Sequence, residues 1–407
     1  MGPGNAVAPQ PTGGRERLAT WTAVAAVAAL VLSAGCQQPV TSTFVRIDTA
    51  DGWRLSLRRF EPEVVDPSRA PVVLCHGLNC NDHFWDLHEK VSLARYLAGR
   101  GYDVWVPALR GAGRSTKHGF VVMRRLIRPV LPELPHELSL RIIDPNTLNW
   151  TMDDYVEYDV PAILATVREQ TGAPAVHWVG HSMGGVIIYA YVERFGDEGL
   201  ATITTLGTPL TIPQPPNEFL RAFGSNKELF SLITFLINAS VPASWQMFGQ
   251  RDGVRAAMYN PRNVDRSVLH EFYTKGVEDI PTGVLEQLVD SVKTGSLRSK
   301  DGEVNYAAEL GTVTVPCFVA GGLVDLIAEP ESIRYVYNNI GSEDKAFHIF
   351  AVVNNNIINY GHLDLVIGRY APRDVFPAIE RWLAKHRLPA PYQPRKSGRP
   401  QGGPTPE

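Results

Sequence analysis

Cysteine is scarce in this chain of 407 residues, and the four that it has are scattered. Four cysteines so far apart are too few for the disulfide framework that stabilises small secreted domains. None of them forms a Cys-x-x-Cys pair, so the usual zinc and thiol-redox motifs are lacking. Cys75 and Cys317 fall in stretches that we expect to be buried strands, and we expect no bridge between Cys75 and Cys80. The sequence therefore predicts neither a metal site nor a bound cofactor.

An excess of charge of one sign is also lacking. The chain has 39 Lys and Arg against 42 Asp and Glu, a net charge of −3, and no run of like charges. Such a chain lacks the basic surface that nucleic-acid binding requires, so we expect no nucleic-acid partner. The apolar share of 44% and the charged share of 20% are typical of a globular protein with a sizeable core.

The N-terminal residues have the pattern of an export signal. Arg15 and Arg17 precede the apolar run LATWTAVAAVAALVLSAGC, which ends on Cys36. Because the run is shorter than the ~20 residues of a spanning helix and ends in small residues, we predict a signal peptide over residues 1–35. The string LSAGC resembles the lipobox of bacterial lipoproteins. That resemblance implies that Cys36 is acylated and anchors the protein to a membrane.

The destination of the exported chain follows from the same resemblance. Gln37 comes after the cysteine, and by the sorting rule of bacterial lipoproteins this indicates the outer membrane. Two alternatives stay open at this point, namely plain secretion and an uncleaved anchor.

Beyond the signal, predicted strands alternate with predicted helices. A glycine-containing turn at DTADG separates two extended runs, which indicates a hairpin. Strands alternating with helices at this spacing predict an α/β fold with a doubly wound, mostly parallel sheet. The strands are expected at 43–60 (the hairpin), 70–78, 102–108, 175–180, 200–209, 314–322 and 345–353, and the helices at 87–98, 153–171, 184–196 and 373–386.

One long segment, residues 210–308, interrupts the alternation. It has no clear buried strand but several helical patterns, among them the unusually apolar KELFSLITFLINASVPASWQMF. A structureless insert of this length is rare in a compact domain, so we predict a helical cap whose apolar surface lines a substrate pocket. The α/β core is then expected at 36–209 and 309–388. The Pro- and Gly-rich residues 389–407 are expected to be a disordered tail.

The string WVGHSMGG contains a serine in a Gly-x-Ser-x-Gly pattern. The pattern is short enough to occur by chance, but here a buried strand enters it and a helix leaves it. Gly180, Gly184 and Gly185 permit the tight turn of a nucleophile elbow, which would expose the Ser182 hydroxyl above the sheet. A hydroxyl is a poor nucleophile near neutral pH, so Ser182 needs a base and the base needs an orienting acid.

Two residues further along the chain supply those partners in the order typical of this fold, Ser then Asp then His. Asp325 follows the predicted strand 314–322, and His362 lies in the loop before the last helix. Taken alone, Asp325 could cap a helix and His362 could be a surface histidine, but both fall at the carboxyl ends of strands, where α/β sheets place catalytic groups. We expect the nearby Asp364 to be structural.

An oxyanion hole is expected beside this triad. One backbone N–H should come from Met183, directly after the nucleophile, and the other from Leu78 in the loop after strand 70–78. His76, Gly77 and His181 are expected to shape these turns rather than to react.

The chain resembles the α/β-hydrolase serine esterases, and within them the acid lipases of the gastric and lysosomal type. The resemblance rests on HGL, SLARYLAGRGYDVWVPALRGAGRS, NWTMDDYVEYDVPAIL, VHWVGHSMGG, LGTP, GGLVDLIAEP and YGHLDLVIG, in the same order over most of residues 70–385. It implies hydrolysis of carboxylic esters with an apolar acyl part, small-molecule or lipid, and Ser182, Asp325 and His362 match its catalytic positions. Met183 stands where these lipases usually have Gln.

Other functions could use the same triad. A thioesterase, an acyltransferase and a polyester depolymerase stay open as alternatives, as does a non-catalytic lipoprotein that keeps the fold as a scaffold.

Overall fold

The computed structural model describes residues 1–2, 40–116, 149–225 and 257–395. The chain divides into two units, Met1–Val40 and Thr41–Glu407, and the second unit contains the described helices and strands. Three predictions lie outside the described residues: the signal peptide from residue 3 onward with Cys36, the apolar stretch at 227–248, and the tail after residue 395. Within the described ranges, no helix has the length and apolar character needed to span a bilayer.

A sheet of eight strands runs through the second unit in the order β1-β2-β6-β3-β7-β8-β9-β10. β1 and β2 form the predicted hairpin, β2 is antiparallel to β6, and every other neighbouring pair is parallel. The doubly wound, mostly parallel α/β sheet is therefore confirmed. The bounds are Ser42–Asp48 (β1), Arg54–Phe60 (β2), Val72–Cys75 (β3), Val104–Ala108 (β6), Val176–His181 (β7), Leu200–Leu206 (β8), Cys317–Gly322 (β9) and Lys345–Phe350 (β10).

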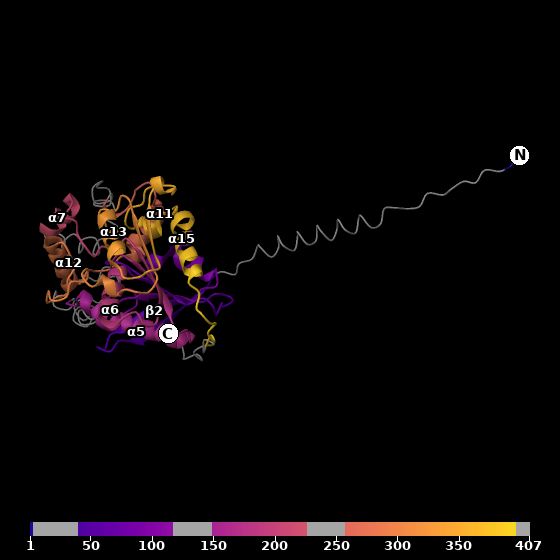
Figure 1. Ribbon diagram of the computed structural model, residues 1–407, viewed down its shortest axis with the longest axis horizontal. Coiled ribbons are helices and arrows are strands. Elements are labelled where there is room, and N and C mark those ends of the chain that lie inside the picture. Colours follow the sequence, from indigo (N-terminus) through magenta and orange to yellow (C-terminus); the bar gives the residue numbers. More distant parts are fainter. Residues whose placement is uncertain (3–39, 117–148, 226–256, 396–407) are drawn as a thin grey trace, which may run out of the picture. The chain divides into compact units, whose positions relative to one another are not determined.

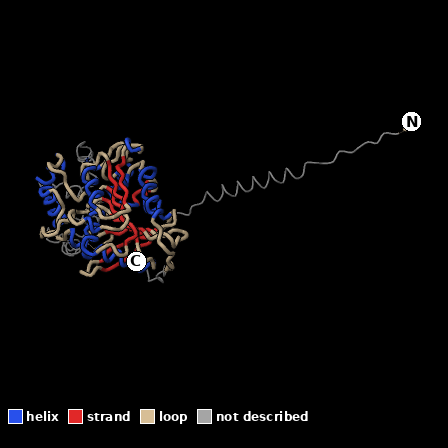
Figure 2. Tube along the Cα trace, in the orientation of Figure 1, coloured by secondary structure: helices blue, strands red, loops and turns tan. Residues whose placement is uncertain are grey.

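Helices lie on both sides of this sheet, as Figures 1 and 2 show. α2 packs against α15, and α5 packs against α6. α5 ends at Gly172 in the left-handed conformation, as its glycine predicts. The bounds are Leu93–Ala98 (α2), Val160–Thr171 (α5), Met183–Phe195 (α6), Pro330–Asn339 (α13), Asp364–Ile367 (α14) and Ala371–Lys385 (α15).

The helix predicted at 87–98 begins later than the sequence pattern indicates. Its first residues instead form a small antiparallel pair, Asp86–His88 (β4) with Val91–Ser92 (β5). α2 begins after Ser92, whose hydroxyl accepts a hydrogen bond from the Arg95 N–H at 3.1 Å and donates one to Asp86 at 2.7 Å. An N-cap with two partners fixes the helix start more strongly than the apolar periodicity does.

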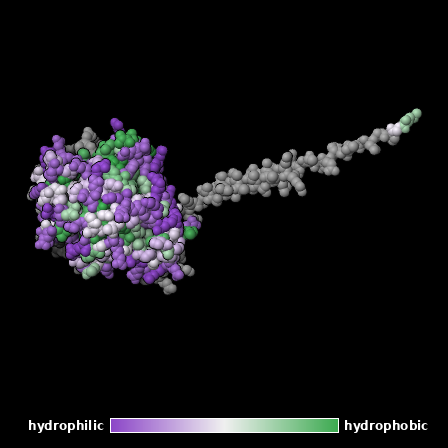
Figure 3. All heavy atoms as spheres, viewed as in Figure 1, coloured by the Kyte–Doolittle hydropathy of each residue, from purple (hydrophilic) through white to green (hydrophobic). Residues whose placement is uncertain are grey.

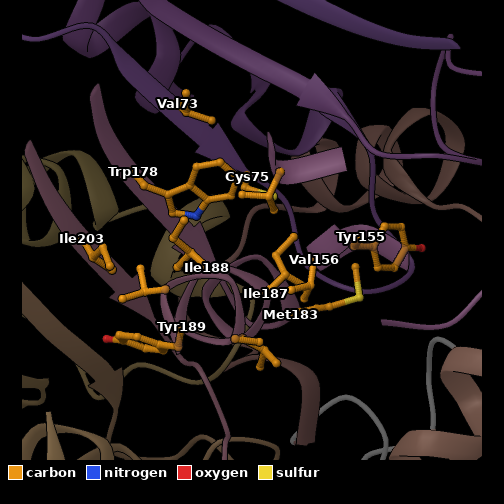
Figure 4. Packing of buried hydrophobic residues seen from close by; sticks show 14 of the residues in the cluster. Val73, Cys75, Tyr155, Val156, Trp178, Met183, Ile187, Ile188, Tyr189 and Ile203 are labelled. Atoms are coloured by element: carbon orange, nitrogen blue, oxygen red, sulfur yellow. The ribbon is translucent and has the colours of Figure 1, made fainter. Parts of the chain in front are cut away.

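Figure 4 shows how α6 is held against the sheet. Ile187 and Ile188 belong to the same buried cluster as Trp178 of β7 and Tyr155 of the π-helix η3 (Tyr155–Asp159). The indole N–H of Trp178 also donates to the Gly184 carbonyl at 2.9 Å. These contacts fix the position at which β7 turns into α6, which is the position of Ser182.

The described residues of the segment 210–308 include four helical elements and add no strand to the sheet. They form α7 (Glu218–Ser225), α11 (Arg266–Glu271), a π-helix η4 (Phe272–Gly276) and α12 (Thr282–Thr294). An isolated β-bridge joins Thr211, before α7, to Ser296, after α12. This helical character agrees with the pattern read from the sequence.

The prediction of disorder is wrong for the first residues of the tail. Residues 389–395 lie against the domain, and Tyr392 is buried in a small cluster with Ala70, Ala173 and Leu388. The Tyr392 N–H donates to the Pro67 carbonyl, and the Arg395 N–H donates to the Thr171 carbonyl, both at 3.1 Å. Burial of Tyr392 and these backbone bonds order a stretch whose composition indicated disorder.

Candidate active site

Ser182 sits in a strained turn between β7 and α6. Its backbone has φ 52° and ψ −120°, a conformation that side-chain-bearing residues rarely adopt and that costs of order 1–3 kcal/mol. Two glycines make the turn possible, because a side chain on Gly180 would overlap the Gly184 backbone and one on Gly184 would overlap the Cys75 carbonyl. The Ser182 N–H donates to the Leu206 carbonyl at 2.9 Å, which ties the turn to the next strand.

His362 and Asp325 form a buried pair. The His362 Nδ1 lies 2.8 Å from the Asp325 Oδ2, and their side chains are 4% and 0% exposed. The second carboxylate oxygen of Asp325 accepts N–H bonds from Ile327 at 2.9 Å and Ala328 at 2.8 Å. Asp325 is not the N-cap of α13, a place that Glu329 takes. With Nδ1 bonded to a carboxylate, the proton belongs on Nδ1 and the lone pair of Nε2 stays available as a base.

Gly207 leaves room for this pair. It follows β8 with φ +56°, and a side chain there would come within 3.1 Å of the Asp325 carboxylate and 3.2 Å of His362 Nδ1. A Cβ at this position would be too close to both groups and would force a local shift of the pair.

Ser182 and His362 both line one cavity of about 380 Å³. Its walls are almost entirely apolar, and many of them come from the segment 210–308. The sequence predicted that this segment lines a pocket, and the apolar stripe of α12 is the signal that could have identified individual lining residues. The lining side chains from that segment include Leu210, Leu220, Phe272, Ile280, Leu288, Val292 and Leu297.

The two predicted oxyanion-hole residues flank the serine. Met183 opens α6, and Leu78 follows Gly77 in the loop after β3; both line the cavity. Gly77 packs so closely that a side chain there would lie 3.0 Å from the Ser182 Cβ. The backbone of this loop therefore passes directly against the serine.

A family profile described as the alpha/beta hydrolase fold matches residues 70–268. Solved esterases share the architecture. The esterase EaEST from Exiguobacterium antarcticum has a TM-score of 0.55 at 13% identity, covering 84% of this chain and 100% of that one. An esterase from Thermogutta terrifontis has a TM-score of 0.52 at 18% identity, covering 85% of this chain and 100% of that one. The chain has the α/β-hydrolase fold.

Proteins named as lipases are similar to this chain over most of its length. It is 29% identical over 374 residues to a tear acid lipase-like protein of Mesocricetus auratus, covering 82% of this chain and 86% of the relative. It is 24% identical to lipase lipl-1 of Caenorhabditis elegans (82% and 86% covered) and 23% identical to gastric triacylglycerol lipase of Bos taurus (84% and 88%). The resemblance to acid lipases is therefore confirmed, and it supports an enzyme that hydrolyses carboxylic esters.

Two other histidines of the hydrolase lie near the site without the setting of a base. His181 Nε2 lies 3.0 Å from the His362 carbonyl oxygen, and burial holds the pKa of its imidazole well below the ordinary value. His76 Nε2 accepts the Leu109 N–H at 3.2 Å, and burial also lowers its pKa. Both rings are neutral packing elements, in agreement with the structural roles expected of them.

The three described cysteines of the hydrolase are free thiols. Cys75, Cys80 and Cys317 are all buried, and Cys75 and Cys80 are not bridged. Burial raises the pKa of each thiol, so none of them is present as a reactive thiolate near neutral pH.

Exposed apolar side chains gather around the loops that carry the pair. Figure 3 shows hydrophobic side chains concentrated at the top of the view. Among the described residues, the large exposed apolar side chains include three beside Asp325 and three in the loop that leads to His362, namely Leu323, Val324, Leu326, Val352, Val353 and Ile357.

Asp364 fixes the loop that carries His362. Its Oδ1 accepts the N–H groups of Gly361 and Asn260, both at 3.0 Å, and its Oδ2 accepts the Asn263 side-chain amide at 2.8 Å. Burial raises the pKa of this carboxyl to about 6 despite these bonds. Asp364 therefore joins the His362 loop to the segment 257–263, in agreement with the structural role expected of it.

We expect Asp364→Asn to flatten the pH dependence of stability. Because the folded pKa is raised, the folded protein binds this proton more tightly than the unfolded chain, so its stabilising contribution is present below about pH 4 and is lost as the pH rises through 6. The free energy of unfolding, measured by denaturant titration at pH 4 to 7.5, should fall with rising pH in the wild type by up to about 3 kcal/mol more than in Asp364→Asn. Parallel profiles for the two proteins would contradict this assignment.

Proposed function

We propose that the hydrolase cleaves esters with a Ser182–His362–Asp325 triad. The observation that carries the proposal is the buried hydrogen bond of 2.8 Å between His362 and Asp325. His362 lines the same cavity as the strained Ser182. Ser182 Oγ attacks the ester carbonyl carbon while His362 Nε2 takes its proton. Asp325 keeps the imidazole in the reactive tautomer and stabilises it when it becomes charged.

The remaining steps use the same groups. The backbone N–H groups of Leu78 and Met183 stabilise the negative oxygen of the tetrahedral intermediate. His362 then gives its proton to the leaving alcohol, and an acyl group stays on Ser182. A water molecule activated by His362 releases the acid and restores the enzyme.

The cavity supports an ester with a substantial apolar acyl part. A space of about 380 Å³ with apolar walls favours a hydrocarbon chain over a charged or sugar-like group. Several relatives are named lipases, which supports a lipid ester as the natural substrate. Because both 36–209 and 210–308 contribute walls, we take 210–308 as a cap over the catalytic core 36–209 and 309–388.

We further propose that the protein is exported and anchored through acylated Cys36, with the outer membrane as its place. The export pattern of residues 1–35 and the string LSAGC support this. Relatives named for the stomach and for tears support export in general.

Removing the nucleophile should abolish turnover. We expect Ser182→Ala to lower kcat on a p-nitrophenyl ester by at least about 1000-fold, because the triad acts as a unit. A fluorophosphonate probe should label the wild type and miss this variant. Ser299→Ala, at a surface loop, serves as the control and should keep both properties. Equal labelling of wild type and Ser182→Ala would refute the triad.

Chain-length preference tests the acyl pocket. Across p-nitrophenyl esters from acetate to palmitate, we expect kcat/KM to rise toward medium or long chains. Leu288→Trp, which fills the cavity from α12, should move the optimum to shorter chains, whereas Asp290→Trp on the exposed side of α12 should not. A triacylglycerol emulsion measured alongside separates a lipase from an esterase. Fastest turnover of the acetate ester, unchanged by Leu288→Trp, would rule out the pocket as assigned.

The anchor is tested in a bacterial host fed with labelled palmitate. The full-length chain should carry the label and lose it in Cys36→Ala, because the thiol of that residue is the attachment point. Mass spectrometry of the mature protein should find an N-terminal lipid-modified cysteine. A mature chain without lipid would leave plain secretion as the correct description.

A further inference from the structure

The loop that provides the predicted oxyanion donor Leu78 is held from outside the core. Directly after Leu78, the chain pairs with the end of η4: Cys80 forms an antiparallel bridge with Val277, and the Glu278 N–H donates to the Asn79 carbonyl at 3.0 Å. The Asn79 side-chain amide returns a bond to the Glu278 carbonyl. A segment about 200 residues away in sequence thus supports this loop with backbone and side-chain bonds.

The Glu278 side chain adds a second connection beneath the same loop. One carboxylate oxygen, Oε1, accepts the Asn81 side-chain amide and the Gly113 backbone N–H, both at 2.9 Å. Glu278 is only 7% exposed and Asn81 only 3%. Gly113 belongs to the loop after β6, so a single oxygen links three segments: the Leu78 loop, the loop after β6 and the end of η4.

Asn81 is also bonded to the backbone of its own loop. Its Oδ1 accepts the His83 N–H at 2.9 Å, and its amide also donates to the Lys275 carbonyl at 2.8 Å. Asn79, between Asn81 and Leu78, has a left-handed backbone with φ 60°. Such a conformation is unfavourable for a residue with a side chain and persists where surrounding bonds hold it.

We propose that Glu278 is a positioning residue for the oxyanion hole. Its carboxylate does not touch the reacting atoms; it holds Asn81, and through Asn81 the loop in which the Leu78 N–H must point at the developing oxyanion. Bonds to a charged acceptor are about twice as strong as neutral ones, and an oxyanion hole depends on donors fixed before the reaction. This inference rests on the proposed function, because it assigns a support to that same site.

The test compares Glu278→Ala and Glu278→Gln with the wild type on a soluble p-nitrophenyl ester. Glu278→Ala should lower kcat by roughly 10- to 100-fold with little change in KM, as expected when a catalytic group is displaced by about 1 Å. Glu278→Gln should recover most of the activity, because its amide oxygen can still accept both N–H bonds. Glu271→Ala is the matched control: the Glu271 carboxylate pairs with the Lys275 side chain at 3.3 Å, and its loss should leave kcat unchanged.

A transition-state analogue separates positioning from general loss of structure. A trifluoromethyl ketone forms a hemiketal with the serine, and its oxyanion needs the same N–H donors. Its inhibition constant should therefore rise in Glu278→Ala by about the factor by which kcat/KM falls. A folded Glu278→Ala with unchanged kcat, or a folded Glu278→Gln as impaired as the alanine variant, overturns the inference.

Two further variants keep the test decisive. If Glu278→Ala does not fold, Asn81→Ala removes the same bond from the other side and should lower kcat with KM preserved; an unchanged kcat overturns the inference. Ser182→Ala reports on the proposed function separately. An active Ser182→Ala refutes the triad itself, whereas an inactive Ser182→Ala beside a fully active Glu278→Ala refutes only the role of Glu278.

Discussion

The close approach of three backbones around Ser182 is the constraint on which the rest of the site depends. β7, α6 and the loop after β3 come together so tightly that Gly180 and Gly184 have no space for a side chain and Gly77 has very little. The serine is forced into φ 52°, and the buried packing of α6 against β7 holds it there. A loss of packing under α6 would therefore displace Ser182 from the other two residues of the proposed triad.

Buried carboxylates hold the surrounding loops in place. Asp364 joins the His362 loop to residues 257–263, and Glu278 joins the Leu78 loop to the loop after β6. Arg110, which follows β6, is paired with Asp159 of η3 at 2.8 Å, and both side chains are almost fully buried. A buried charged group that lost its partners would destabilise the fold, so each of these carboxylates favours a single arrangement of the segments that it joins. The catalytic geometry thus depends on polar contacts as much as on the apolar core.

The sequence predicted the features that depend on local patterns of residues. The alternation of strands and helices, the elbow around Ser182, and the placement of Asp325 and His362 after strands follow from spacing and from turn residues. It misplaced the start of α2, where the side-chain bonds of Ser92 override the apolar periodicity. It also missed the order in residues 389–395, because the pocket that receives Tyr392 is built from distant segments. The role of Glu278 could not be predicted, because nothing near that residue in the sequence indicates that its carboxylate meets Asn81 and Gly113.

The short stretch from Phe272 to Ile280 has two roles. Its apolar side chains line the cavity, and its backbone and Glu278 support the loop beside the serine. Natural substitutions in this stretch that reshape the pocket would also disturb the support of the Leu78 loop, and with it turnover. Adaptation to a new acyl chain should therefore proceed through α12 or α7, whose cavity residues are independent of that support. The architecture divides the pocket wall into a part that is free to diverge and a part that is not.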